Sequence, residues 1–229
     1  MNTWIHASIL WTDSALRRVD YFRECVPNAR VFLDGHGGDI PEGQGASWNH
    51  CARAAFARTH DAGIVLVHID AYPDEAYLDG FVQEAQAAGA GLALARRENF
   101  ACIYITREAY KTIGPFDANF YPASPLIGCD YLARAKRAGV RVAWCGSPSG
   151  FLHVHCSSLQ HEGYRRAYAH FAHANREYWR MKWGVYPGML LYKIPFQGED
   201  HCRALAARMK ALQKKILDSS ASAEHFRNQ

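Results

Sequence analysis

The stretch that most constrains the fold is residues 63–73, which reads Gly-Ile-Val-Leu-Val-His-Ile-Asp-Ala-Tyr-Pro. A short, mostly apolar run rich in β-branched residues, bounded by Gly63 and Pro73, is typical of a strand buried on both faces in a parallel sheet. The run ends at Asp70. Open α/β sheets bind ligands at the carboxyl ends of their strands. The sequence therefore predicts a ligand site at this edge, with Asp70 in it.

Strand-like and helix-like segments alternate around this run. The expected strands cover residues 6–11, 30–33, 64–69, 92–95, 102–106, 140–144 and 151–156. The expected helices cover residues 14–25, 47–60, 74–88, 107–113, 129–138, 162–183 and 199–217. Strands that alternate with helices predict an α/β fold with a mostly parallel central sheet flanked by helices, followed by a helical C-terminal extension.

Composition narrows the class of protein. The chain has no apolar run of about 18 residues, so we expect no membrane-spanning helix, and residues 1–10 lack the pattern of a signal peptide. Seven cysteines without a Cys-x-x-Cys pair do not suggest a disulfide framework or a zinc ribbon, and reduced thiols in the cytoplasm are the simplest interpretation. A net charge of +4 is compatible with an anionic ligand such as a nucleotide but is not diagnostic of nucleic acid.

Six segments, taken in order, resemble a known family: residues 48–55, 64–70, 105–117, 130–139, 153–155 and 178–184. Together they resemble the GT-A fold glycosyltransferases of the inverting family 2 type, over roughly residues 31–184. The resemblance implies a Rossmann-like GT-A sheet and transfer of a sugar from a nucleotide-diphosphate sugar to an acceptor hydroxyl. It also implies that the transfer inverts the anomeric configuration of the sugar. It also implies a nucleotide-sugar-binding half (1–96), an acceptor-binding and catalytic half of the same domain (97–184), and a C-terminal amphipathic helix and tail (185–229).

The metal motif of this family is Asp-x-Asp at the end of a strand, and the aligned triplet here is His68-Ile69-Asp70. The resemblance implies that Asp70 binds a divalent cation, Mn²⁺ or Mg²⁺, and that the first position contacts the donor. Because that position holds His68, the site differs from the family pattern, and imidazole suits Mn²⁺ or a softer metal better than Mg²⁺. An alternative role for Asp70 is a helix N-cap.

The family's second metal contact is a late histidine, for which His153 and His155 are the candidates. They are two residues apart in a strand-like stretch, so their side chains share a face. Alternatives are two structural histidines, or a zinc site completed by Cys156 or another histidine.

The resemblance also implies a general base, Asp130, at the start of a helix. A helix N-terminus favours the ionised carboxylate, and an ordinary N-cap is the alternative. For the nucleotide, the resemblance points to Asp34 at the second strand end, to Thr12 at the first, and to Asn49 near the diphosphate. Each of these three can instead serve as a turn or capping residue.

Residues 164–183 interleave aromatic and basic side chains. Such a segment can bind nucleic acid, or it can pack its aromatic groups on the core, which we favour. The sequence does not identify the acceptor, which can be a glycan, a small molecule or a modified base in DNA. A non-catalytic nucleotide- or glycan-binding module is a further alternative. Leu205, Met209, Leu212 and Ile216 form an apolar seam that can dock on the domain or form a homodimer.

Overall fold

The fold is built on one six-stranded sheet and one two-stranded sheet. The computed structural model describes residues 3–8, 13–34, 43–58, 62–68, 70–96, 99–121, 124–146, 152–153 and 162–184. The larger sheet has the order β2-β1-β3-β6-β5-β7. Its strands are β1 (Thr3–Ser8), β2 (Arg30–Asp34), β3 (Gly63–His68), β5 (Leu92–Arg96), β6 (Asn99–Thr106) and β7 (Val142–Trp144). The smaller sheet pairs β4 (Ala71–Tyr72) with β8 (Leu152–His153).

The six-stranded sheet is mixed, with three of its five pairings parallel. β1 runs parallel to β2 and β3, and β7 runs parallel to β5, whereas β6 is antiparallel to both β3 and β5. The α/β class expected from the sequence is therefore confirmed. Strands from both expected halves, 1–96 and 97–184, belong to this one sheet. The division into a nucleotide-sugar-binding half and a catalytic half stays a prediction.

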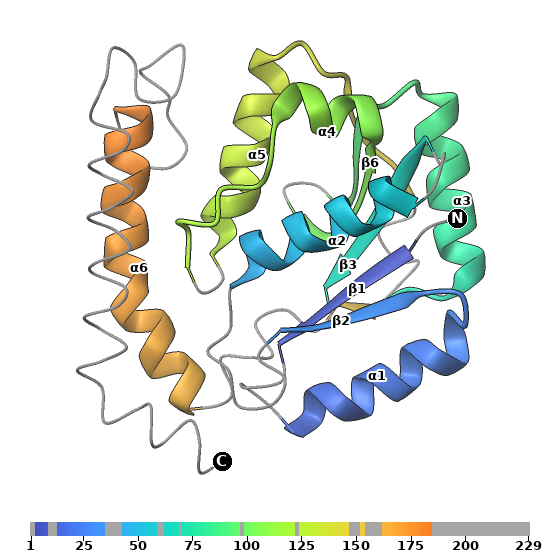
Figure 1. Ribbon diagram of the computed structural model, residues 1–229, viewed down its shortest axis with the longest axis horizontal. Coiled ribbons are helices and arrows are strands. Elements are labelled where there is room, and N and C mark those ends of the chain that lie inside the picture. The colour runs from blue at the N-terminus through green and yellow to red at the C-terminus, as the bar shows by residue number, and fades with distance from the viewer. Residues whose placement is uncertain are drawn as a thin grey trace.

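Helices cover both faces of the sheet (Figure 1). They are α1 (Asp13–Cys25), α2 (Gln44–Arg58), α3 (Glu75–Ala87), α4 (Arg107–Ile113), α5 (Pro125–Arg137) and α6 (Glu162–Trp183). Side chains of α1 and α3 share one hydrophobic cluster, and those of α2, α4, α5 and α6 share another. The sheet lies between these two clusters, and α6 packs beside α5.

Strand β3 contributes to both clusters, as the run at residues 64–69 predicts. Ile64 and Leu66 belong to the cluster with α2, and Val65 and Val67 belong to the cluster with α1 and α3. None of the four is more than 1% exposed. Successive side chains of a strand point to opposite faces, and burying each such side chain contributes about 1.5–3 kcal/mol. This strand is consequently fixed on both sides before it reaches the ligand edge.

The sequence located α4 and α6 accurately but placed the start of α5 too late. The helix begins at Pro125, and the side chain of Ser124 accepts a hydrogen bond from the backbone N–H of Leu126 at 3.2 Å. Serine at the N-cap followed by proline in the first turn is a strong start signal. Asp130 therefore lies inside the helix and not at its N-terminus, so the dipole argument for its ionised form does not apply.

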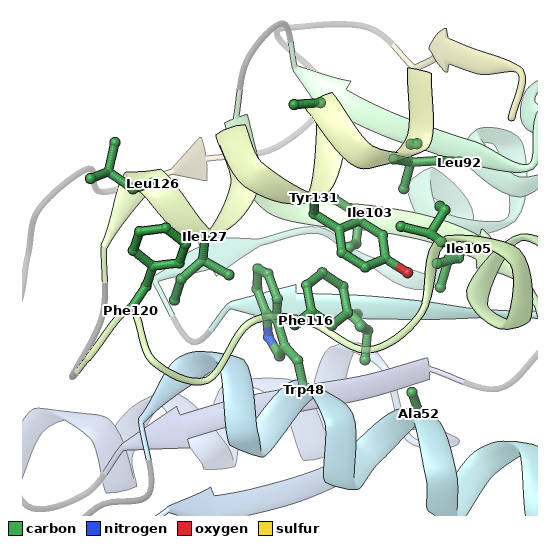
Figure 2. Close-up of a cluster of buried hydrophobic side chains, with 14 of the residues drawn as sticks. Trp48, Ala52, Leu92, Ile103, Ile105, Phe116, Phe120, Leu126, Ile127 and Tyr131 are labelled. Carbon is green, nitrogen blue, oxygen red and sulfur yellow. The ribbon is translucent and has the colours of Figure 1, made fainter. Parts of the chain in front are cut away.

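A stack of aromatic rings fills the space between α2 and α5. Figure 2 shows Trp48, Phe116 and Tyr131 converging there. The ring centroids of Phe116 and Tyr131 are 3.9 Å apart, and Trp48 meets Phe116 edge-on at 5.0 Å. Gly128 allows the same close packing, because a Cβ atom at that position would lie 2.4 Å from the ring of Phe100. These contacts join α5 to the sheet.

In the part of the chain that the structure describes, none of the helices has the length and apolar character needed to cross a membrane. The amphipathic helix expected at residues 199–217 lies outside the described residues.

The aromatic stack yields a paired prediction. Phe116→Ala should lower the free energy of unfolding by about 3–5 kcal/mol, because it leaves a cavity in a packed core. Tyr131→Phe should leave it unchanged or raise it by up to about 1 kcal/mol, since the buried Tyr131 hydroxyl has no hydrogen-bond partner within the described residues. Urea unfolding measures both. A loss of stability in Tyr131→Phe comparable to that in Phe116→Ala would contradict this view of the core.

Candidate functional site

Three parallel strands end at one edge of the sheet. Ser8 and Asp34 are paired at the ends of β1 and β2, and His68 ends β3 opposite His6 of β1. Because β1 lies between β2 and β3, this edge carries Asp34 two strands away from His68. It is the edge at which α/β sheets bind ligands.

His68 and Asp70 are in direct contact at this edge. Nδ1 of His68 lies 2.6 Å from Oδ1 of Asp70, and the two side chains are 20% and 7% exposed. A carboxylate oxygen only accepts, so Nδ1 is the donor in this hydrogen bond. The short distance is typical of a charge-assisted bond. A polar pair of this kind sits at the end of an otherwise apolar strand.

The two-stranded sheet brings a distant part of the chain to the same place. β4 follows Asp70 directly, and its Ala71 pairs with His153 of β8 in an antiparallel register. The backbone of His153 thus lies opposite the residue next to Asp70. The sequence placed a late histidine near Asp70 through the family resemblance, and the strand pairing agrees with that proximity. The metal-binding role of His153 stays a prediction.

The described side chains at this edge supply only some of the ligands that a divalent cation needs. One carboxylate and one imidazole are in contact, which is compatible with a cation that takes its remaining ligands from phosphate oxygens and water. Among the residues that the structure describes, no group of three or more His, Cys, Asp or Glu side chains is gathered for a metal ion. A complete protein cage is therefore not formed by this part of the chain.

Two of the expected site residues, Thr12 and His155, lie outside the described residues. Asp34 is the last residue of β2, in agreement with its expected place at a strand end. Its contact with a nucleotide stays a prediction.

The side chain of Asn49 contacts other parts of the scaffold, whereas the sequence analysis expected it near the diphosphate. Its side chain is buried, donates to the carbonyl of Phe116 at 2.8 Å, and accepts from the N–H of the same residue at 2.7 Å. Its oxygen also accepts from the hydroxyl of Tyr110 at 3.1 Å. These contacts fasten the loop after α4 to α2. We therefore assign the Asn49 amide to the scaffold, because its oxygen accepts two hydrogen bonds and its nitrogen donates one within the protein.

Asp130 likewise does not fit the general base expected from the sequence. It is 0% exposed. Oδ1 accepts from Lys182 Nζ at 2.8 Å and from Trp183 Nε1 at 3.0 Å, and Oδ2 accepts from Arg134 Nε at 2.8 Å. A base has to come within hydrogen-bond reach of the acceptor hydroxyl. Both oxygens of Asp130 are instead engaged inside the protein.

Lys182 links Asp130 to a second buried carboxylate, Asp117. Its Nζ lies 2.5 Å from Oδ2 of Asp117, which also accepts from the hydroxyl of Tyr178 at 2.8 Å. Burial alone would raise the pKa of Asp117, but the Lys182 ammonium, together with hydrogen bonds from Lys182, Asn119 and Tyr178, outweighs burial and holds that pKa below its ordinary value. This cluster joins α6 to α5 and to the loop after α4.

Helix α6 settles one of the alternatives left open by the sequence. Its aromatic side chains Phe171, Tyr178, Trp179 and Trp183 are buried, whereas His173, Arg176 and Arg180 are exposed. The packing interpretation of this segment is therefore confirmed for its described side chains. The sequence analysis did not single out Lys182, which is buried. Its spacing of four from Tyr178 was the available signal, because such residues share a helix face.

Comparisons with known proteins find similarity only among solved structures. No family model matches the chain, and no curated protein matches it. A mutant of Drosophila β1,4-galactosyltransferase 7, solved with manganese, UDP-Gal and xylobiose, is 14% identical, with a TM-score of 0.44 over 68% of this chain and 71% of that one. Glucosyl-3-phosphoglycerate synthase from Mycobacterium tuberculosis, solved with Mn²⁺, UDP and glucosyl-3-phosphoglycerate, is 12% identical, with a TM-score of 0.43 over 76% of this chain and 79% of that one.

The buried cluster predicts a large difference in stability between two variants of α6. Lys182→Met should lower the free energy of unfolding by about 3–5 kcal/mol, because it leaves the buried carboxylate of Asp117 without its cation and removes one of the two cations on Asp130. Arg180→Met on the exposed face of α6, where Arg180 pairs with Glu177, should cost at most about 1 kcal/mol. Urea unfolding compares them. Equal losses would show that Lys182 is no more important than a surface cation.

The lowered pKa of Asp117 predicts a loss of stability in acid. As the pH falls, the unfolded chain protonates Asp117 first, so the stabilisation is complete above the ordinary pKa of 3.8 and is lost as the pH falls through the lower folded value. Between about pH 5 and pH 2, the unfolding free energy of Asp117→Asn should therefore fall less steeply than that of the natural chain. Urea unfolding at a series of pH values measures both slopes, and identical slopes would contradict the assignment.

Proposed function

We propose that this protein is a glycosyltransferase that moves a sugar from a nucleotide-diphosphate sugar to an acceptor hydroxyl. The observation that carries the proposal is the His68–Asp70 pair at the carboxyl end of β3, with His153 opposite Ala71 across the small sheet. The sequence resemblance to GT-A glycosyltransferases places the metal motif at this same point. The mixed α/β sheet supplies the strand edge that such a site needs.

The proposed site works with a divalent cation, Mn²⁺ or Mg²⁺. When bound, such an ion neutralises the charge that develops on a leaving diphosphate. In this chain His68 and Asp70 would hold it, with His153 and His155 as further candidates. The partly buried position of the pair strengthens its interactions with charged ligands, because the local dielectric is lower than that of water.

The nucleotide would lie along the same edge, toward β1 and β2. Asp34 ends β2 and pairs through its backbone with Ser8, and Thr12 follows β1 in the sequence. We propose these two for the base and ribose. Asn49 is left out of this role, because its amide is engaged by Phe116 and Tyr110.

From the sequence resemblance, we also propose that the transfer inverts the anomeric configuration of the sugar. It needs a base other than Asp130, which we assign to the scaffold on its burial and its three donors. The anomeric configuration of the product, read by NMR, distinguishes inversion from retention. The acceptor stays open among a glycan, a small molecule and a modified DNA base, and the homodimer through residues 199–217 stays a prediction.

A second candidate function is a non-catalytic module that binds a nucleotide or a glycan. The observation that favours it is the use of Asn49 and Asp130 by the scaffold, since two positions expected to serve the reaction are occupied by structural contacts. Such a module would bind nucleoside diphosphates at the same strand edge without releasing sugar.

Turnover of nucleotide sugars tests the proposal. With Mn²⁺ present, the protein should release sugar from at least one member of a panel of UDP-, GDP- and ADP-sugars. Asp70→Ala should reduce this release by roughly 100-fold or more, in line with the loss of a group that holds the metal. Asp79→Ala, the same substitution at an exposed position of α3, is the matched control and should retain full activity.

Two results decide between the candidates. Binding of nucleoside diphosphates without any sugar release would favour the non-catalytic module. Unchanged turnover in Asp70→Ala would remove the strand edge at β3 from the reaction.

A further inference from the structure

Strand β7 forms one outer edge of the six-stranded sheet. β5 pairs with it on one side, and no strand of the described chain pairs with it on the other. The carbonyl of Arg141 accepts from the N–H of Leu92, and the N–H of Cys145 likewise donates to a carbonyl of β5. Alternate residues of a strand direct their backbone groups to the same neighbour, so those of Val142 and Trp144 point away from β5. Each of these two residues offers one backbone donor and one acceptor at the outer edge.

A large aromatic side chain is exposed at the same edge. Trp144 is 48% exposed, and among the described residues only Trp144 and Leu152 are exposed large hydrophobic side chains. Side chains of alternate residues lie on one face of a strand, so Trp144 shares a face with Val142, which packs against the cluster that contains α5. Exposed tryptophan is a frequent anchor of protein–protein contacts. The edge of β7 therefore combines outward backbone groups with an aromatic anchor.

The surroundings of this edge are basic. Lys136 and Arg137 in the last turn of α5 are exposed, and so is Arg141, which directly precedes β7. Residues 131–146 contain no aspartate or glutamate. Glu84 of α3 contributes an acidic group at the other end of β7, where it accepts from the backbone of the following turn. Positive charge is thus concentrated where β7 begins.

These charges indicate which partner fits the edge. A second copy of this chain would bring the same cations together, and short basic edge strands are one means by which proteins avoid pairing with themselves. An acidic segment in an extended conformation would pair with the outward backbone groups and place its carboxylates near the cations. Nucleic acid matches the positive charge and the aromatic ring, but it has no use for a row of strand donors and acceptors.

We propose that the outer edge of β7 binds an acidic, extended segment of a partner protein by strand addition. Val142 and Trp144 supply the backbone hydrogen bonds, the Trp144 ring packs against an apolar side chain of the partner, and Lys136 and Arg141 set the preference for acidic residues. β6 and β5 separate this edge from β3, so the inference does not depend on the proposed function.

Fluorescence anisotropy of a labelled peptide tests the inference on the full chain. The probe is a short peptide in which glutamate alternates with valine, and the same peptide with lysine in place of glutamate is the charge control. At low salt the protein should bind the acidic peptide with a dissociation constant below about 1 mM, and the basic peptide at least about tenfold more weakly. Methylation of all backbone nitrogens of the acidic peptide removes its strand donors and should weaken binding by roughly tenfold or more.

Two matched pairs of variants locate the binding surface. Trp144→Ala should weaken binding of the acidic peptide by about tenfold or more, whereas Leu152→Ala, at the other exposed apolar side chain, should leave it unchanged. Lys136→Glu should weaken binding by about threefold or more, whereas Arg176→Glu on the exposed face of α6 should not. All four side chains are exposed, and circular dichroism checks that each variant is folded.

Three results with the peptides would overturn the inference: no binding of the acidic peptide, equal binding of its methylated form, or unchanged binding in Trp144→Ala. Two further results would assign the surface to another partner and would also overturn it. One is a single-stranded DNA oligonucleotide that binds more tightly than the acidic peptide and loses its affinity in Trp144→Ala. The other is a dimer of the natural chain, measured by sedimentation, that dissociates in the same variant.

Discussion

The contact of Lys182 with two buried carboxylates holds the second half of the molecule together. Asp117 follows α4, Asp130 lies in α5, and Lys182 comes from the last turn of α6. Arg134 adds a second positive charge on Asp130, so the described cluster contains two acidic and two basic side chains. Charges this deep in a protein contribute less to net stability than to a unique arrangement, because their desolvation offsets much of their attraction. The cluster therefore determines the position of α6 on α5 more than it adds to the free energy of unfolding.

The same arrangement separates scaffold from site. On the α2 side of the sheet, Asn49, Asp117 and Asp130 are occupied by partners within the protein. At the carboxyl end of β3, His68 and Asp70 pair with each other, at the edge where α/β sheets generally bind ligands. The four buried residues of β3 before them give this pair a rigid support. A site on a strand end that is packed on both faces is held more precisely than one on a loop.

Local sequence signals predicted the elements well. The continuous apolar run identified β3, and the bounds of α4 and α6 follow from periodicity and caps, such as Thr106, which accepts from the N–H of Ala109. The start of α5 was missed because Ser124-Pro125 lies in a stretch that reads as an aromatic loop. Partners distant in sequence could not be predicted: Lys182 is 65 residues from Asp117, and Asp130 is 53 residues from Trp183. The sequence alone does not distinguish a buried structural aspartate from a catalytic one, because the partners that decide between them are distant along the chain.

Hydrogen exchange in the presence of nucleotide tests the central claim most directly, namely that the ligand site lies at the carboxyl end of β3. With UDP and Mn²⁺ bound, backbone amides of residues 68–72 and 152–153 should exchange more slowly, because a ligand there suppresses the opening of β4 and β8. Amides along α6 should be unaffected. Protection confined to α6, with no change at residues 68–72 despite binding, would contradict the account.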